Sequence, residues 1–178
     1  MRRISSNNGI AGTDEQGSVI VELALMLPLL AMLILGSVDL GLIVREHQLL
    51  QNAAREGARF SAQPANKIDP VTPAATQVAT AQLIRDRVIN YLAQEKITIA
   101  TTACAEDGAI PGQFNCGPIT IFQQQPIVTI VGPDTFTDFG SAVSVTYDRA
   151  FLFSGGSLFK FNTVSLRGNS VFRNLYGN

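Results

Sequence analysis

The sequence predicts an α+β fold, in which one long N-terminal helix is followed by a second helix and then by an antiparallel sheet. Three observations lead to this prediction. An apolar run over residues 18–44 continues into strong helix formers as far as Ala62. Residues 74–95 then repeat their apolar side chains with the helical period. Beyond them, the pattern changes to the apolar/polar alternation of half-buried strands.

The composition narrows the class of protein. A length of 178 residues suits one domain and an anchor, since domains typically have about 100–150 residues. The formal charge of −1 and the pI near 5.8 argue against a nucleic-acid-binding protein, which usually carries a basic patch. Charged residues make up 15% of the chain, against about 25% in soluble domains. We therefore expect a membrane protein and no nucleic-acid partner.

The apolar run over residues 18–44 is long enough to cross a membrane. As a helix rising about 1.5 Å per residue it extends for roughly 40 Å, and a hydrocarbon core measures about 30 Å. A secretory signal peptide has an apolar region of about 7–15 residues, followed by a cleavage site. Here the run is longer and continues into helix. We expect residues 18–44 to stay attached as a transmembrane helix and residues 45–62 to continue it outside, before Pro64 ends it.

Charged and helix-distorting residues interrupt the run. Glu22 lies near its start, and a carboxylate in hydrocarbon costs several kcal/mol unless it is paired, so Glu22 is either a functional group or sits at the interface without a role. Pro28 removes a backbone hydrogen bond and is expected to kink or loosen the helix. Asp39 is expected to mark the outer interface, with functional pairing as the alternative.

Small residues recur on the continuation of the helix, with spacings of three and four that let another backbone approach closely. They are Ala54, Gly57, Ala58 and Ser61. The approaching element is either the helix of a partner subunit or the sheet of the same chain, and we favour the sheet for part of this surface. Glu56 can reach Arg59 one turn on.

Residues 63–178 are expected to form the folded domain. Pro64–Pro73 has the composition of a linker. The second helix is expected over Ala74–Glu95, with one apolar face made of Val78, Leu83, Ile84, Val88, Tyr91 and Leu92. Strands are expected from Ile97 and over 119–122, 127–131, 142–148 and 162–172, with turns at 132–134 and 154–157. The apolar segment 151–161 is too short to span a bilayer, and we interpret it as a core-covering turn in preference to a partner-binding loop.

Three stretches near the N-terminus resemble a known family. Gly17-Ser18, followed by Glu22 and an apolar helix, resembles a type IV prepilin processing site. Residues 18–60 are similar to the TadE-like minor pilins, or pseudopilins, of tight-adherence pili, and the matching stretches are Val21–Leu30, Gly36–Gly41 and Leu50–Phe60. The resemblance covers about a quarter of the chain. The sequence departs from the family in having Asp14-Glu15-Gln16 before the site, where basic residues are common, and Leu23 after Glu22, where an aromatic residue is more usual.

The resemblance implies a processed pilus subunit with a pilin-like domain. A prepilin peptidase would cut between Gly17 and Ser18 and remove residues 1–17 as a leader. Glu22 would then pair with the freed amine of an adjacent subunit and set the axial register. The implied partners are that peptidase, other pilin subunits, the pilus assembly platform and the membrane. The implied location is the bacterial inner membrane, with a single span, a periplasmic C-terminal domain and possible passage into the extracellular pilus.

The positive charges of Arg2 and Arg3 would then set the orientation of the chain in the membrane. The alternative is an uncleaved single-pass protein whose outer domain is a binding module.

Two cysteines, Cys104 and Cys116, flank a Gly/Pro-rich loop. In a periplasmic domain they are expected to form a local disulfide worth about 2–3 kcal/mol, and two free thiols are the alternative. A metal site needs about four ligands, and no His or further Cys lies nearby in sequence. We expect neither a metal nor a cofactor.

The sequence lacks the patterns of common enzymes. It contains no GxxxxGK[ST] loop and no Ser/His/Asp set, and His47, its single histidine, is expected at the helix surface. The adjacent acids Asp14-Glu15 and Glu106-Asp107 fall in a leader and a loop, where acid–base catalysis is poorly supported. We therefore predict that the chain is not an enzyme.

Overall fold

The computed structural model describes residues 13–68, 73–131, 134–151 and 163–174. Most of the expected leader, the predicted turns at 132–133 and 154–157, and nearly all of the apolar segment 151–161 lie outside the described residues. The chain divides into two compact units, residues 1–41 and residues 42–178. The long helix contributes to both.

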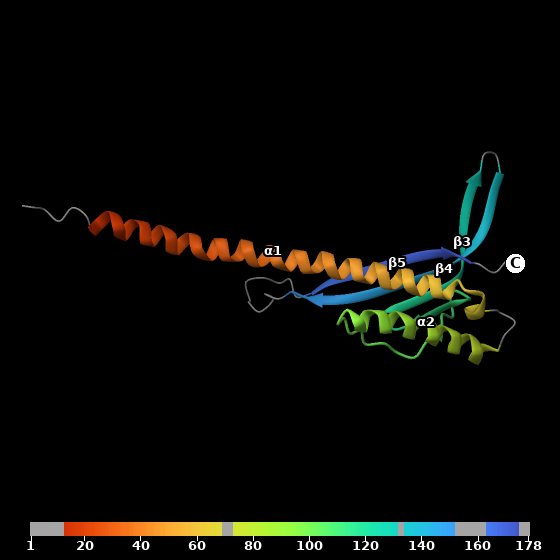
Figure 1. Ribbon diagram of the computed structural model, residues 1–178. Helices are drawn as coiled ribbons and strands as arrows, with labels where there is room; N and C mark the ends of the chain where they lie inside the picture. The colour runs from red at the N-terminus through yellow and green to blue at the C-terminus, as the bar shows by residue number, and fades with distance from the viewer. Residues whose placement is uncertain (1–12, 69–72, 132–133, 152–162, 175–178) are drawn as a thin grey trace, which may run out of the picture. The chain divides into compact units, whose positions relative to one another are not determined.

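The predicted α+β class is confirmed. Helix α1 (Thr13–Ser61) is followed by a short 3-10 turn, η1 (Pro64–Asn66), and by helix α2 (Ala74–Gln94). Five strands then form one antiparallel sheet in the order β1-β2-β3-β4-β5 (Figure 1). Their bounds are β1 (Ala105–Glu106), β2 (Gln113–Cys116), β3 (Ile119–Val131), β4 (Asp134–Ala150) and β5 (Thr163–Arg173).

Helix α1 begins five residues earlier than Ser18, the start that the sequence predicts. Its first residues include Asp14 and Glu15. The apolar period alone could not reveal this extension, because the added turn is polar.

Helix α2 lies close to its predicted bounds, and it ends in a Schellman cap. The N–H groups of Lys96 and Ile97 donate to the carbonyls of Ala93 and Leu92, both at 3.0 Å. Lys96 takes the left-handed conformation (φ 62°) that this cap requires. Ile97 is then buried as the hydrophobic contact of the cap. The prediction of a strand starting at Ile97 was therefore wrong.

The apolar face predicted for α2 is largely present. Ile84, Val88 and Leu92 are buried, and Val78 and Tyr91 are partly buried against them. Leu83 is the exception, because it is 58% exposed. It precedes Ile84 by one residue, which is a rotation of about 100° around the helix and takes it off the packed face.

The three long strands cover the segments predicted from the sequence, but the first two segments form one strand. Strand β3 spans both 119–122 and 127–131, with a register shift against β4 between Phe122 and Gln125. Such an irregularity bends the strand that carries the extra residue. Beyond this shift the paired ends of β3 and β4 turn away from the rest of the sheet (Figure 1). The short hairpin of β1 and β2 was not predicted.

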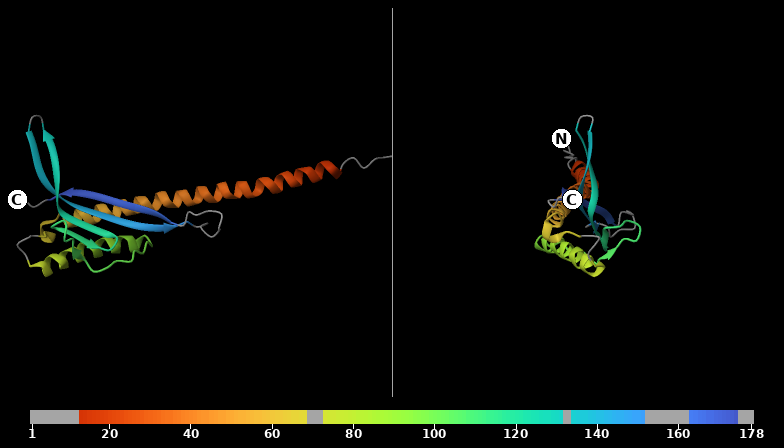
Figure 2. Two further views of the ribbon diagram at one scale, coloured as in Figure 1. Left: turned by 180° about the vertical axis from the view of Figure 1, so that it is seen from behind. Right: turned by 90° about the vertical axis from the view of Figure 1, so that its right-hand side faces the viewer.

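One face of the sheet carries the core. The C-terminal part of α1 and helix α2 lie on that face (Figures 1 and 2). The buried cluster joins residues of the two helices to residues of the strands, namely Leu50, Ala53, Ala54, Ala58, Ile84, Val88, Leu92, Phe114, Ile119, Ile121, Val143, Val145 and Leu166. Small residues on α1 allow the helix to approach the strands closely.

The closest approach of α1 to the sheet is at Gly168 of β5. A Cβ atom at Gly168 would overlap the backbone carbonyl of Leu50, which cannot move aside as a flexible side chain could. Beside it, the N–H of Asn169 donates to the Gln51 side chain at 3.3 Å. The missing side chain of Gly168 thus fixes the distance between helix and strand.

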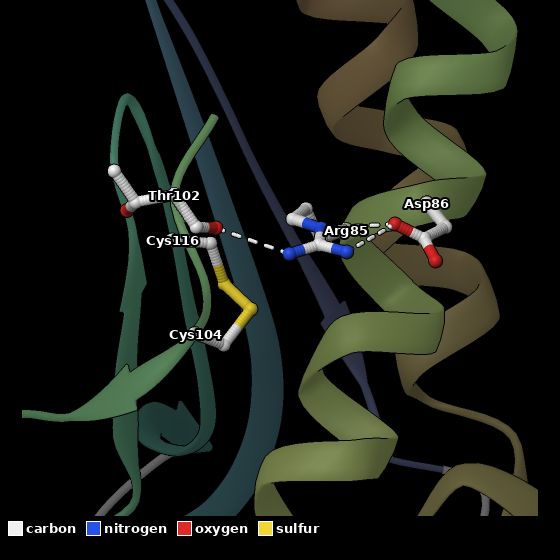
Figure 3. A network of polar contacts seen from close by, with 5 residues as sticks. All are labelled: Arg85, Asp86, Thr102, Cys104 and Cys116. Carbon is white, nitrogen blue, oxygen red and sulfur yellow. Dashed lines mark hydrogen bonds and ion pairs between the residues drawn. A yellow bond between two sulfur atoms is a disulfide. The ribbon is translucent and has the colours of Figure 1, made fainter. Parts of the chain in front are cut away.

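Cys104 and Cys116 are joined by a disulfide next to a cation of α2 (Figure 3). The Arg85 guanidinium donates to the carbonyl of Thr102 at 3.0 Å and pairs with Asp86 at 2.7 Å. The irregular segment before β1 is therefore tied to the sheet by the disulfide and to α2 by Arg85. Both cysteines are buried.

The loop closed by the disulfide is organised around the Asp107 carboxylate. One oxygen accepts from the N–H of Ala109 at 2.9 Å, and the other accepts from the side-chain amides of Gln113 (3.1 Å) and Asn115 (3.0 Å). The backbone hydrogen bond from Ala109 and the bond from Asn115 lower the pKa of Asp107 below its ordinary value of 3.8.

The Gln123 side chain connects the end of α1 to the irregular part of β3. It is 1% exposed. Its amide nitrogen donates to Ser61 Oγ at 2.9 Å and to the carbonyl of Asn66 at 2.6 Å, and its amide oxygen accepts from the N–H of Ile68. The Asn174 side chain donates to the Gln123 backbone carbonyl at 2.9 Å. One buried amide therefore satisfies the polar groups of the chain that leaves α1.

We expect Gln123→Leu to destabilise the domain. The Ile68 N–H would remain buried without an acceptor, which by itself costs about 1–3 kcal/mol. Urea unfolding of the detergent-solubilised protein, followed by circular dichroism, measures the loss. Gln94→Leu is the control, because Gln94 is exposed at the end of α2. Equal unfolding midpoints for the two variants would contradict this account of Gln123.

The lowered pKa of Asp107 predicts that the stability of the domain depends on pH. Because the folded pKa is lowered, ionised Asp107 stabilises the loop above pH 3.8, and this contribution disappears as the pH falls through the lower folded pKa. Asp107→Asn should therefore be less stable than the wild type at pH 6, and the difference should shrink below pH 3.8. Thermal unfolding of both proteins between pH 6 and pH 2 measures this difference in stability. Asp148→Asn is the control, because Asp148 is an exposed aspartate. A difference that persists unchanged at pH 2 would contradict the assignment.

Candidate functional site

The N-terminal part of α1 presents an apolar surface on all sides. Its large hydrophobic residues from Val19 to Leu40 are 38–73% exposed. The helix Gly17–Ser61 is long and apolar enough to cross a membrane, with a mean hydropathy of 2.5 over its most apolar window, and it is the one such helix among the described residues. A helix that is apolar all round is buried in a protein core or in lipid. Among the described residues, the large side chains on this part of α1 stay exposed.

The residues of the expected processing site lie within two turns of this helix. Ser18 and Glu22 are both exposed, and their spacing of four places them on the same face. A Cβ atom added at Gly17 would meet nothing within 4 Å. Glu22 is the single charged residue between Ser18 and Val38. The Gly17–Ser18 bond itself lies inside the helix, since α1 begins at Thr13.

Two polar or helix-breaking features of the apolar part are accommodated locally. Pro28 lies inside α1, which continues on both sides of it. The Ser37 hydroxyl donates to the Leu33 carbonyl at 2.8 Å, one turn back. This bond satisfies the hydroxyl within its own helix, as surroundings without water require.

Asp39 differs from its neighbours on the helix. Among residues 18–41 it alone is buried, with 6% of its surface exposed. That Asp39 marks the outer interface, with functional pairing as the alternative, stays a prediction. A buried carboxylate needs partners, and the sequence pattern offers no way to find them.

The small residues of α1 contact the protein's own domain. Ala54, Ala58 and Ser61 are fully buried, and a Cβ at Gly57 would lie 2.5 Å from Val88 Cγ2 of α2 and 3.3 Å from Val143 Cγ1 of β4. These positions are therefore filled by α2 and the sheet of the same chain.

The ion pairs of α1 also involve the domain, and the local pairing that we expected for Glu56 does not account for its partner. Glu56 pairs at 2.7 Å with Arg87 of α2, whose guanidinium also lies 5.9 Å from the Phe60 ring centre. Glu46 pairs with Arg149 of β4 at 3.2 Å, and the Arg149 side chain is 8% exposed. Both partners are distant in sequence, so no local pattern could have revealed them.

The described residues contain no group of three or more His, Cys, Asp or Glu side chains able to hold a metal ion. His47 lies exposed on α1. The features that stand out are therefore an apolar helix with one exposed carboxylate, Glu22, and a domain that packs around the C-terminal part of that helix.

Comparison with known proteins agrees with this geometry. Residues 17–59 match the family model of TadE-like proteins, which is about a quarter of the chain and includes Gly17, Ser18 and Glu22. The chain matches none of the curated proteins and none of the solved structures. Residues 17–59 are therefore similar to TadE-like proteins, and they include the exposed apolar part of a helix that is long and apolar enough to cross a membrane.

Proposed function

We propose that the chain is a minor pilin or pseudopilin that takes part in assembly or priming of a Tad pilus after prepilin peptidase cuts it between Gly17 and Ser18. The observation that carries the proposal is the exposed apolar part of α1 with Glu22 as its single charge over residues 18–38. A carboxylate in that setting is costly unless another subunit supplies a cation.

Glu22 would select one arrangement of neighbouring helices. Cleavage frees a cationic amine on Ser18, one helical turn from Glu22. When such helices pack side by side, only some axial shifts place the carboxylate of one next to the amine of another. A buried charge is costly alone and tolerable when paired, so the pairing favours one register.

The closed packing of the domain supports a role for the exposed half of α1 in assembly. The small residues from Ala54 to Ser61 already contact α2 and the sheet. Other pilin subunits and the assembly platform would then be met through residues 18–40. The role is structural, and it requires no enzymatic activity of this chain.

The proposed location is the bacterial inner membrane, with a single span and the C-terminal domain in the periplasm. Arg2 and Arg3 precede the span, as the positive-inside rule expects for a cytoplasmic leader. The disulfide between Cys104 and Cys116 suits an oxidising compartment. Passage into the extracellular pilus would follow assembly.

The second candidate is an uncleaved single-pass protein whose outer domain binds a ligand or surface. The helical state of the Gly17–Ser18 bond favours this reading, because a protease must unwind a helix to reach the bond. Retention of residues 1–17 in a host with an active prepilin peptidase would support it.

In such a host we expect the membrane-extracted protein to begin at Ser18. Gly17→Leu should retain residues 1–17, because a large side chain replaces hydrogen at the cut. Intact-mass analysis and N-terminal sequencing measure both outcomes. Gly36→Leu is the matched control, since a Cβ at Gly36 also meets nothing within 4 Å, and it should be processed normally. If the wild-type protein kept residues 1–17 in this host, the proposed cleavage by prepilin peptidase would be contradicted.

We expect Glu22→Ala to leave membrane insertion intact and to reduce incorporation into pili more than about tenfold, because losing a buried charge pair costs about 3–5 kcal/mol. Immunoblots of membrane and sheared-pilus fractions compare the two steps. Leu23→Ala controls for loss of a side chain at the next position, and Glu22→Asp should retain more incorporation than Glu22→Ala. Normal incorporation of Glu22→Ala would contradict the role of this carboxylate.

A further inference from the structure

A pocket of about 310 Å³ lies between α1 and the C-terminal end of α2. Small-molecule pockets measure about 300–1,000 Å³, so this one suits a headgroup better than a whole lipid or cofactor. Leu42 and Ile97 are among its apolar lining residues. Four charged residues, Arg45, Glu46, Glu95 and Lys96, also line it. The pocket therefore combines an apolar wall with charges of both signs.

These charges are only weakly engaged with one another. Arg45 and Glu95 approach to 4.0 Å, and their side chains are 66% and 40% exposed, so little is lost if either turns to a ligand. Glu46 Oε2 lies 3.2 Å from Arg149 Nε in an ion pair, and this buried atom accepts no hydrogen bond from the described residues. The Glu46 side chain as a whole is 22% exposed, so its carboxylate can accept a hydrogen bond from a ligand while it keeps the ion pair with Arg149.

Lys96 holds an unfavourable backbone conformation at the rim of this pocket. Its φ of 62° is the left-handed state that a helix C-cap usually gives to glycine. A side chain at this position costs stability, so a lysine there is informative. Strain at such a residue points to a use for the side chain itself.

The pocket lies where the apolar run ends. Leu42 belongs to that run, and Arg45 is the first charged residue after Asp39. Because α1 is one continuous helix, Arg45 lies about 4.5 Å beyond Leu42 along the axis, at about 1.5 Å per residue. If residues 18–44 span the membrane, the pocket opens at the level of the outer-leaflet headgroups.

We propose that this pocket binds the headgroup of a phospholipid bearing a phosphate and a primary amine, of the phosphatidylethanolamine type. Arg45 and Lys96 bind the phosphate. The carboxylates of Glu46 and Glu95 accept hydrogen bonds from the ammonium group. The inference rests on the membrane anchoring in the proposed function, but it requires neither cleavage nor pilus assembly.

The test is native mass spectrometry of the full-length protein, delipidated in detergent and titrated with phosphatidylethanolamine. We expect one lipid to bind, and Arg45→Gln combined with Lys96→Gly to weaken binding at least about tenfold, since charge-assisted hydrogen bonds are lost. Arg55→Gln is the matched control, because Arg55 is exposed on the same helix and does not line the pocket. Equal binding by the double variant would overturn the proposal.

The single variant Lys96→Gly separates an effect on lipid binding from an effect on folding. Glycine adopts a positive φ without strain, so the melting temperature should stay equal or rise while lipid binding falls. Unchanged binding would overturn the role of Lys96.

Phosphatidylcholine tests the ammonium site, because its methylated amine cannot donate hydrogen bonds. It should bind at least about tenfold more weakly than phosphatidylethanolamine. Equal affinity would overturn the amine contacts. Soluble glycerophosphoethanolamine should bind more weakly than the lipid, and equal affinity would overturn the membrane as the source of the ligand.

Membrane fractionation distinguishes this inference from the proposed function. A chain in the membrane fraction that binds no lipid overturns the inference alone. A chain recovered in the soluble fraction overturns both.

Discussion

One helix must satisfy two different surroundings, and this constraint organises the rest of the structure. Up to Leu40, α1 exposes large apolar side chains, which suits lipid or the surfaces of other helices. From Leu50 onward the same helix carries alanine and glycine, and it packs so closely that Gly168 of β5 has no room for a Cβ. The change from bulky to small residues marks the point where α1 passes from one surrounding to the other.

The exit of the chain from this helix is fixed by buried polar contacts. After Ser61 the backbone leaves helical pairing, and its polar groups would be costly inside the core without partners. The Gln123 side chain supplies those partners to Ser61, Asn66 and Ile68. The irregular register of β3 at this residue belongs to the same arrangement. The Gln123 side-chain amide therefore joins the end of α1 and residues 66–68 to β3.

The charged residues of α1 also differ between its apolar part and the part that packs in the domain. Glu46 and Glu56 pair with Arg149 and Arg87, which belong to β4 and α2. These pairs hold the helix in its domain. Glu22 lies exposed in the apolar part of the helix, and in lipid a carboxylate is costly unless it is paired. Glu46 and Glu56 thus stabilise the fold through ion pairs, whereas Glu22 lies exposed on the apolar part of α1.

The sequence by itself determined the long helix, the second helix, the segments that the three long strands cover, and the resemblance of residues 18–60 to TadE-like proteins. Each depends on local periodicity or on a short motif, which neighbouring residues specify. It missed the β1–β2 hairpin, the exposure of Leu83, the cap at Lys96 and the arginine partners of Glu46 and Glu56. Only the tertiary structure decided these features, because contacts between residues far apart in the chain leave no periodic pattern, and packing selects among locally equivalent alternatives.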